Sequence, residues 1–312
     1  MIDPALKAEL EKCPTLPSLP AVAVQVMRLC QAEDLDLSAI AKVISNDPAL
    51  AAKILRLVNS SAYGLPQQVK TVSHAVALLG LNTVRTLALS FSLARDLRSR
   101  PQVGVDLRSY WKRSLLSAVA ARELAMALSV AHLKEEAFLG GLLQDIGRLA
   151  LLALAPVTYA RITAEAGDDH IVLAAAEHKA LGCDHSEVGQ WLTEHWNLPP
   201  PLCLATGFSH APMTLPPETN DAVALLIRIV ALSGWLADIW LKDDAFGTTI
   251  AAREFASRLL DLRPPQLEPV LAQMAAGMGD VSSLFEIDLG TVEDIRAVLG
   301  HAKQSLSVGV TP

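Results

Sequence analysis

The chain has 312 residues, of which 51% are hydrophobic and only 4% are aromatic, and it carries a formal charge of −7. Its apolar mass is mainly Ala, Leu and Val, which favours helices and argues against a large β-sheet. The acidic balance, with a pI near 5.6, disfavours a broad surface for nucleic-acid backbones. The four cysteines form no CxxC pair, and we expect reduced thiols in a reducing compartment.

Apolar residues recur at three- and four-residue spacing along most of the chain, which predicts an all-α fold. In the N-terminal part a helix is expected after Pro20, to about Gln31. A second is expected after Asp47, a good N-cap followed by Pro48, to about Asn59, and a third covers 82–97.

The segment around residue 105 holds Pro, Gly and charges without periodicity, so we place a lobe boundary there. Further helices are expected over the ranges 107–128, 134–154, 171–179, 184–195, 200–207 and 221–241, with breaks in the tail at Pro264–Pro265 and Gly277–Gly279. The predicted domains are an N-terminal lobe (1–105), a second helical lobe (106–245) and a helical extension (246–312).

Two segments resemble membrane spans in composition. The segment 149–160 is too short, and 222–241 is interrupted by Arg228 and Asp238. The N-terminus has no basic segment followed by an apolar one. We therefore expect a cytoplasmic protein without membrane contact.

Asp145 stands in GGLLQDIGRLALL, within an otherwise apolar segment. Leu142, Leu143, Ile146 and Leu149 form the apolar stripe of the expected helix, and Asp145 lies at its edge. Downstream, the segment 176–210 supplies His178, His185, His195 and His210. Acids and imidazoles from separate helices build metal sites in all-α folds, but a single helical histidine is more often a surface or core residue.

An ordered set of segments carries a family resemblance: LPSLPAVAVQVM, ISNDPALAAKILRLVNSSAYG, TVSHAVALLGLNTVRTLAL, YWKRSLLSAVAARELA, AFLGGLLQDIGRLAL and EHKALGCDHSEVGQWLTEHWNLP. Over residues 15–245 the chain resembles the HDOD family, relatives of the HD and HD-GYP metal-dependent phosphohydrolases. The resemblance implies a two-lobed helical fold, with an N-terminal lobe and a degenerate HD-type bundle. It also implies that Asn59 and Tyr63 fix the end of their helix.

The resemblance also assigns the ligand positions of the HD metal site. The first His falls at Arg113, the His of the His-Asp pair at Gln144, and the later Asp at Gly234 or Ser233, while Asp145 is retained. His185 and His210 correspond to additional histidines of the HD-GYP type. Arg113 is a permanent cation and repels a metal ion, so we expect it to form an ion pair with Asp145.

These losses predict no catalytic residue, no cofactor and no catalytic metal, but a vestigial pocket of Arg113, Gln144, Asp145, His185 and His210. The expected function is that of a non-catalytic bacterial signalling regulator, in two-component or cyclic-di-GMP-linked signalling, that acts on a separate protein partner. A small ligand remains possible and nucleic acid is not expected.

Two alternatives stay open. Asp145, His185 and His210 could hold one ion as a two-His, one-carboxylate set in a divergent phosphohydrolase. A nucleic-acid-associated regulator fits less well, because the chain is acidic.

Overall fold

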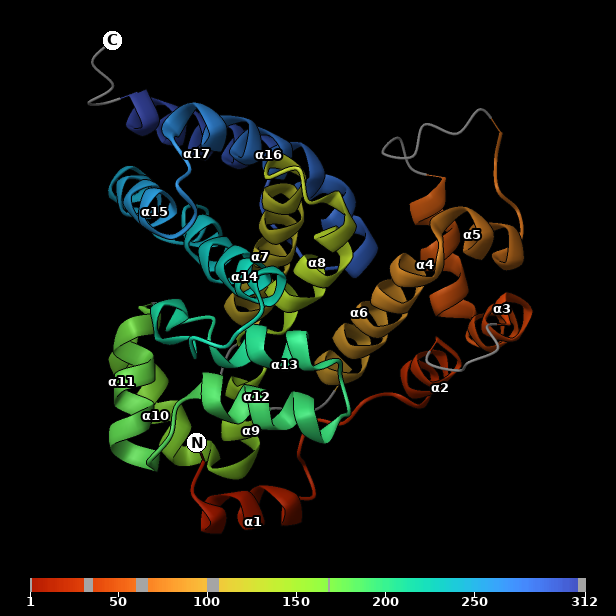
Figure 1. The fold of residues 1–312 in the computed structure, drawn as a ribbon, viewed down its shortest axis with the longest axis horizontal. Coiled ribbons are helices and arrows are strands. Elements are labelled where there is room, and N and C mark those ends of the chain that lie inside the picture. Colours follow the sequence, from red (N-terminus) through yellow and green to blue (C-terminus); the bar gives the residue numbers. More distant parts are fainter. Residues whose placement is uncertain (1, 31–35, 60–66, 100–106, 168, 308–312) are drawn as a thin grey trace. The chain divides into compact units, whose positions relative to one another are not determined.

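A computed structural model describes residues 2–30, 36–59, 67–99, 107–167 and 169–307, without the side chains of 96–99 (Figure 1). Over these residues every regular element is a helix, which confirms the expected fold class. Contacts divide the chain into two compact units. The first comprises Met1–Pro17, Gln102–Gly279 and Ile287–Pro312, and the second Ser18–Pro101 and Asp280–Glu286. The expected boundary at residue 105 lies outside the described residues.

The second unit contains five helices in chain order: α2 (Ala21–Cys30), α3 (Leu37–Ser45), α4 (Pro48–Val58), α5 (Val72–Leu79) and α6 (Leu81–Ser99). Asp47 caps α4 as predicted, since its carboxylate accepts from the Leu50 amide. Asn59 ends α4, and its side chain exchanges two hydrogen bonds with the backbone of Val69. Asn59 therefore fixes the end of α4, and Tyr63 lies outside the described residues.

The first unit begins with α1 (Pro4–Lys12) and continues from α7 (Arg108–Ala127) to α14 (Asp221–Asp238). Helix α7 packs against both α8 (Lys134–Leu143) and α14, and its middle is almost wholly buried. The helices between them are α9 (Gly147–Leu154), α10 (Pro156–Ala166), α11 (His170–Leu181), α12 (His185–His195) and α13 (Pro200–Gly207), with short 3₁₀ turns at Ala131–Leu133 and Pro212–Thr214.

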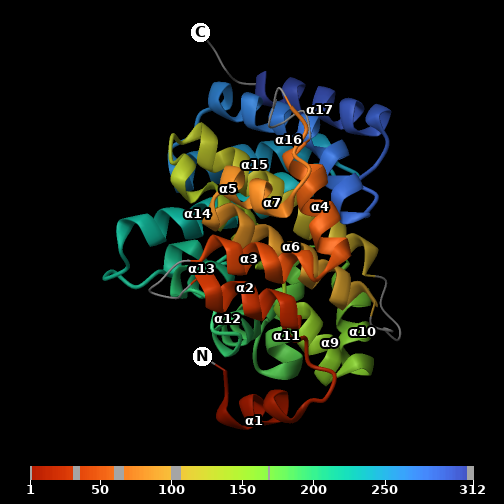
Figure 2. The ribbon, with the colours of Figure 1, turned by 90° about the vertical axis from the view of Figure 1, so that its right-hand side faces the viewer.

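Three helices complete the described chain: α15 (Ala245–Leu260), α16 (Pro264–Phe285) and α17 (Val292–Ser307). Both views place α17 and α1 at opposite ends of the first unit (Figures 1 and 2). The expected break at Gly277–Gly279 is wrong, because α16 runs through it. Leu271, Met274, Met278 and Val281 are buried along this helix, and their packing outweighs the poor helix propensity of glycine.

The single helix expected over 134–154 is also wrong, because a turn at residues 144–146 separates α8 from α9. The amides of Ile146, Arg148 and Leu149 each bond the carbonyl three residues earlier, which tightens the chain at this point. Gly147 then lies directly against α12. A Cβ there would be 2.0 Å from the His185 carbonyl oxygen. Because of this turn, α9 crosses α12 with the two backbones in contact. Asp145 lies in the turn and not in a helix.

One segment of the described chain, Ala131–Leu154, is long and apolar enough to cross a membrane, and α5 with α6 passes the same test as a pair bent by 117°. In the single segment 83% of the apolar window is buried inside the protein. Such burial is typical of a core helix. The residues 222–241 do not pass the test.

Candidate ligand and metal centre

Asp145 is 1% exposed and forms an ion pair with Arg113 of α7. The Arg113 Nη1 donates to Asp145 Oδ2 at 2.5 Å, which confirms the predicted pair. Arg113 also donates through Nε to Asp238 Oδ1 at 2.9 Å, at the end of α14. Asp238 was recognised in the sequence only as an interruption of an apolar segment. One buried guanidinium thus joins two carboxylates from separate elements.

Gly234 faces the same space as Arg113. A Cβ at Gly234 would lie 2.7 Å from Arg113 Nη2 and 3.0 Å from Gln144 Oε1. The three positions that the resemblance assigns to lost ligands therefore surround one space, and the guanidinium of Arg113 lies in it. Gln144 is buried, and its Nε2 donates to the Gly141 carbonyl, while its Oε1 has no partner among the described residues.

The other oxygen of Asp145 faces three histidines. His210 Nε2 lies 3.0 Å from Asp145 Oδ1, His185 Nε2 lies 3.6 Å from it, and His170 Nδ1 lies 3.8 Å from it. His185 Nε2 and His210 Nε2 are 2.9 Å apart. The structure thus brings together all five predicted residues and adds His170, the first residue of α11.

Glu177 on α11 orients His185. Its Oε2 lies 2.6 Å from His185 Nδ1 and also accepts from the His185 amide, while its Oε1 accepts from the Tyr159 hydroxyl. A carboxylate at Nδ1 places a proton there and turns Nε2 toward Asp145 and His210. Glu177 is fully buried. Its sequence neighbour His178 gives no indication of this contact, because Glu177 pairs with His185, eight residues later.

These contacts set the protonation states of the centre. Burial would raise the pKa of Asp145, but the Arg113 guanidinium, His170 and His210 together outweigh it and hold that pKa well below its usual value. Burial lowers the pKa of His210, and burial together with nearby Arg113 lowers the pKa of His170. For His185 burial acts in the same direction, but the Glu177 carboxylate outweighs it and raises the pKa.

Asp145, His170, His185 and His210 form a donor set that fits one divalent transition ion. Their ligand atoms all lie within 4.8 Å of one another, and the four separations given above, from 2.9 to 3.8 Å, bracket the ~3.3 Å edge of a tetrahedral zinc site. Imidazole nitrogens with one carboxylate oxygen suit zinc, iron or manganese. The expectation of no metal therefore stays a prediction.

The remaining histidines of the sequence set lie elsewhere. His178 is exposed and lies 3.7 Å from Glu187, and His195 is exposed and stacks on Trp191. His170 follows Asp169, the N-cap of α11, and that position gives no sign of a role in the site. Its approach to Asp145 depends on how α11 crosses the bundle, and no local pattern reports that.

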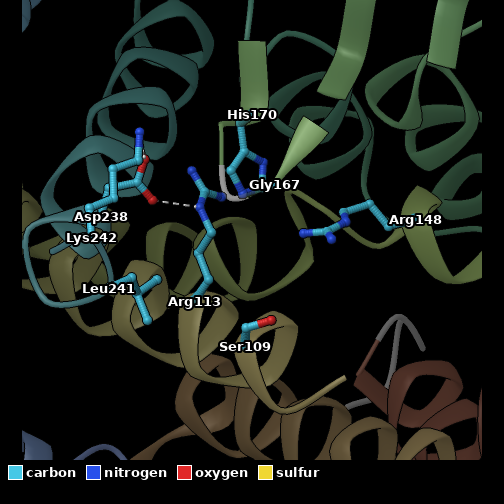
Figure 3. A pocket seen from close by; sticks show the side chains of 8 residues that line it. All are labelled: Ser109, Arg113, Arg148, Gly167, His170, Asp238, Leu241 and Lys242. Carbon is cyan, nitrogen blue, oxygen red and sulfur yellow. Dashed lines mark hydrogen bonds and ion pairs between the residues drawn. The ribbon is translucent and has the colours of Figure 1, made fainter. Parts of the chain in front are cut away.

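A pocket that is open to solvent adjoins this centre (Figure 3). Arg113 and His170, which both face Asp145, line the pocket, and Arg148 reaches toward it from the start of α9. The full lining is Ser109, Arg113, Arg148, Gly167, His170, Asp238, Leu241 and Lys242. The polar groups around this space are therefore mostly cations and hydrogen-bond donors.

Comparison with known proteins identifies the family to which this helical fold belongs. The model of the HDOD domain matches residues 16–212. A structure from Geobacter sulfurreducens, described as an HDOD domain protein of unknown function, superposes with a TM-score of 0.62 at 20% identity, covering 94% of this chain and 98% of that one. A Shewanella amazonensis SB2B structure, named provisionally as a phosphohydrolase, gives 0.59 at 25% identity over 96% and 98%.

Two further relatives are longer than this chain. A Marinobacter aquaeolei VT8 structure, named provisionally as a signal transduction protein, gives a TM-score of 0.56 at 25% identity, covering 97% of this chain and 62% of that one. An uncharacterised protein of Treponema pallidum (strain Nichols) is 26% identical over 209 residues, which are 67% of this chain and 40% of that protein.

Proposed function

The chain belongs to the HDOD domain family, and from that membership we propose that it is a non-catalytic regulator of bacterial signal transduction. It acts by contact with a protein partner in the cytoplasm, in two-component or cyclic-di-GMP-linked signalling. The name of the Marinobacter relative supports the signalling part of the proposal. Binding of nucleic acid or of a membrane is not part of it.

The observation that carries the proposal is the place of Arg113. Its guanidinium lies among Gln144, Gly234 and Asp145, where the resemblance puts three positions of lost metal ligands beside the retained acid. It also engages one oxygen of Asp145, so that oxygen is not free for a metal. A two-metal site, which would clamp the attacking and leaving oxygens of a phosphate, is therefore disfavoured.

The second candidate function is a divergent phosphohydrolase with a single metal ion, and the four-residue donor set favours it. Asp145, His170, His185 and His210 would hold the ion, and Glu177 would keep His185 oriented. Bound there, a divalent ion would supply Lewis-acid polarisation or an activated water. Four protein ligands resemble a closed structural site more than a catalytic site, which keeps one position open.

A hydrolysis assay with added Mn²⁺, Fe²⁺ or Zn²⁺ tests the two candidates. We expect no turnover of bis(p-nitrophenyl) phosphate or of cyclic dinucleotides above that of the His185→Gln variant. Metal-dependent turnover that disappears in His185→Gln and persists in His195→Gln would overturn the regulator assignment. His195 is a suitable control because it is exposed and lies outside the cluster.

A complementation experiment adds a positive test. A strain that lacks the chain is restored with wild type or with a His185→Gln, His210→Gln variant, and the transcript profiles are compared. Regulation by contact predicts that a folded variant restores the profile. Failure of a folded variant to restore it would favour the phosphohydrolase.

A further inference from the structure

The pocket beside the histidine cluster holds more positive than negative groups. Arg113, Arg148 and Lys242 line it, and Asp238 is the one carboxylate among its lining residues. Both oxygens of Asp238 already face cations, with Arg113 Nε at 2.9 Å from Oδ1 and Lys242 Nζ at 3.8 Å from Oδ2. No carboxylate of the lining is left for Arg148.

Arg148 lies at this pocket without an acidic partner among the described residues. Its side chain contacts the Tyr159 hydroxyl and lies 5.8 Å over the ring of Tyr110, while its buried Nε has no hydrogen-bond partner. Tyr159 in turn donates to Glu177, which is already bonded to His185. The cation is therefore contacted by neutral groups, with the charge of Asp145 acting on it without an ion pair, and a buried cation of this kind favours a further compensating anion.

His170 supplies a second unsatisfied donor group. It is 9% exposed, lines the pocket, and its Nδ1 has no hydrogen-bond partner in the described chain, since Asp145 Oδ1 is 3.8 Å away. Figure 3 shows Arg113, Arg148 and His170 around the same space, with Lys242 and Ser109 at its sides. Two guanidinium groups in one pocket repel each other unless an anion lies between them.

We propose that this pocket binds a small phosphate-bearing anion, held by Arg148 and Lys242 beside the positive charge of Arg113. Guanidinium groups match the oxygens of a phosphate with paired hydrogen bonds, and the pocket opens to solvent, so a group attached to the phosphate can extend out of it. The inference goes beyond the proposed function and stands without it, because anion binding here needs neither turnover nor a metal ion.

Calorimetry with inorganic phosphate tests the proposal, in a buffer with EDTA so that no metal-dependent binding contributes. We expect one phosphate per chain, and binding weaker by about tenfold or more in Arg148→Gln, because a charge-assisted hydrogen bond is lost. Lys242→Gln, at the partly exposed edge, should weaken binding by a smaller factor. The matched control is Arg161→Gln, an exposed arginine of α10 outside the pocket.

Two results would overturn the proposal. One is the absence of phosphate binding to folded wild-type protein. The other is binding that survives unchanged in Lys242→Gln and Arg148→Gln, which would indicate an adventitious ion only. If Arg148→Gln does not fold, Arg148→Lys and Lys242→Gln decide the matter. Acetate that binds as tightly as phosphate would contradict the phosphate class, and a phosphate monoester that binds more tightly than phosphate would indicate an attached group in the pocket.

Discussion

Arg113 compensates two buried carboxylates, so its loss affects more than one ion pair. Truncation to Ala would leave Asp145 and Asp238 without their cation in a region that is almost fully buried. We expect Arg113→Ala to lower the free energy of unfolding by about 3–5 kcal/mol, measured by urea denaturation. Asp145→Ala should cost a similar amount, and the double variant clearly less than the sum.

Arg122 provides the matched control for that cycle. It lies on the same helix, half-buried, 3.3 Å from Glu123, so Arg122→Ala should change stability by less than about 1 kcal/mol. Strictly additive effects of Arg113→Ala and Asp145→Ala would show that the two side chains do not stabilise each other in solution.

The histidine cluster predicts a characteristic pH dependence of stability. The pKa of His185 is raised, so its contribution is present below the ordinary histidine pKa of about 6.5 and is lost as pH rises through the folded value. The pKa values of His170 and His210 are lowered, so their contribution is lost as pH falls below about 6.5. Stability from this cluster should therefore pass through a maximum near that pH.

Denaturation curves of metal-free protein between pH 5 and 8 measure this effect. In Glu177→Gln the decline above the maximum should shrink, because the group that raises the pKa of His185 has lost its charge. In His195→Gln the decline in stability above that pH should persist. A wild-type profile without any decline above the maximum would contradict the assignment of His185.

Among single residues, the sequence predicted those members of the site that an alignment with the family motifs can assign. Arg113, Gln144, Asp145, His185 and His210 could be assigned because the resemblance aligns them. His170, Glu177 and Asp238 could not, since they reach the centre only through the crossing of α11, α12 and α14. A buried acid such as Asp238 gives the same sequence signal as an exposed one.

At the scale of the element, the crossing of α9 and α12 depends on Gly147. A methyl group there would lie 2.0 Å from the His185 carbonyl oxygen and 2.6 Å from the Gly189 amide nitrogen, both backbone atoms. We expect Gly147→Ala to destabilise the protein by about 1–3 kcal/mol or more, since the helices must separate. Thermal unfolding followed by circular dichroism measures the change.

Gly279 gives the opposite expectation and serves as the control. It lies within α16, and nothing approaches within 4 Å of a Cβ at that position. Gly279→Ala should stabilise the protein by roughly 0.5–1 kcal/mol, because alanine loses less conformational freedom in a helix. Equal destabilisation by Gly279→Ala and Gly147→Ala would contradict the assignment of the Gly147 effect to the crossing of α9 and α12.

Asp47 combines a helix cap with an ion pair in the second unit. It accepts from the Leu50 amide and from both terminal nitrogens of Arg95, and the Arg95 hydrogen bond lowers its pKa. Asp47→Ala should cost about 1 kcal/mol. Asp47→Asn should keep the cap but remove the stability that wild type loses as pH falls through the lowered pKa, measured by denaturation between pH 2 and 5. Identical acid profiles of wild type and Asp47→Asn would contradict the ion pair.

Helix starts were easier to predict than helix interiors. Asp47 with Pro48 marks the beginning of α4 by local hydrogen-bonding chemistry, and α4 begins there. The turn at Gln144–Ile146 has no such mark, because its residues would also suit a continuous helix. Helix α16 shows the opposite case. It continues through Gly279 although glycine has a low helix propensity, because burial of Met278 stabilises the helix.

Over the full length of the chain, the first compact unit is discontinuous in sequence and resumes at Gln102. We expect limited proteolysis to cut first within residues 98–106, between the two units. Cutting inside 134–154 should be slower, because 83% of the apolar window in Ala131–Leu154 is buried. Mass spectrometry of the first fragments measures the order, and faster cleavage within 134–154 would contradict the core position of α8 and α9.

The composition predicted the all-α class, but not which distant segments join. Residues 1–17 belong with the first unit, where Trp196 Nε1 donates to the Pro17 carbonyl and α1 contacts α9. Nothing in the periodicity of α1 indicates a partner more than a hundred residues later.

Gly234 and Arg113 also constrain how this protein can evolve. The absent side chain at Gly234 is what leaves room for the guanidinium, since a Cβ there would lie 2.7 Å from Nη2. A larger side chain at 234 would press on Arg113, and loss of the guanidinium at 113 would leave Asp145 without its arginine partner. The two positions are therefore coupled, and a substitution at one of them changes which residues the other tolerates.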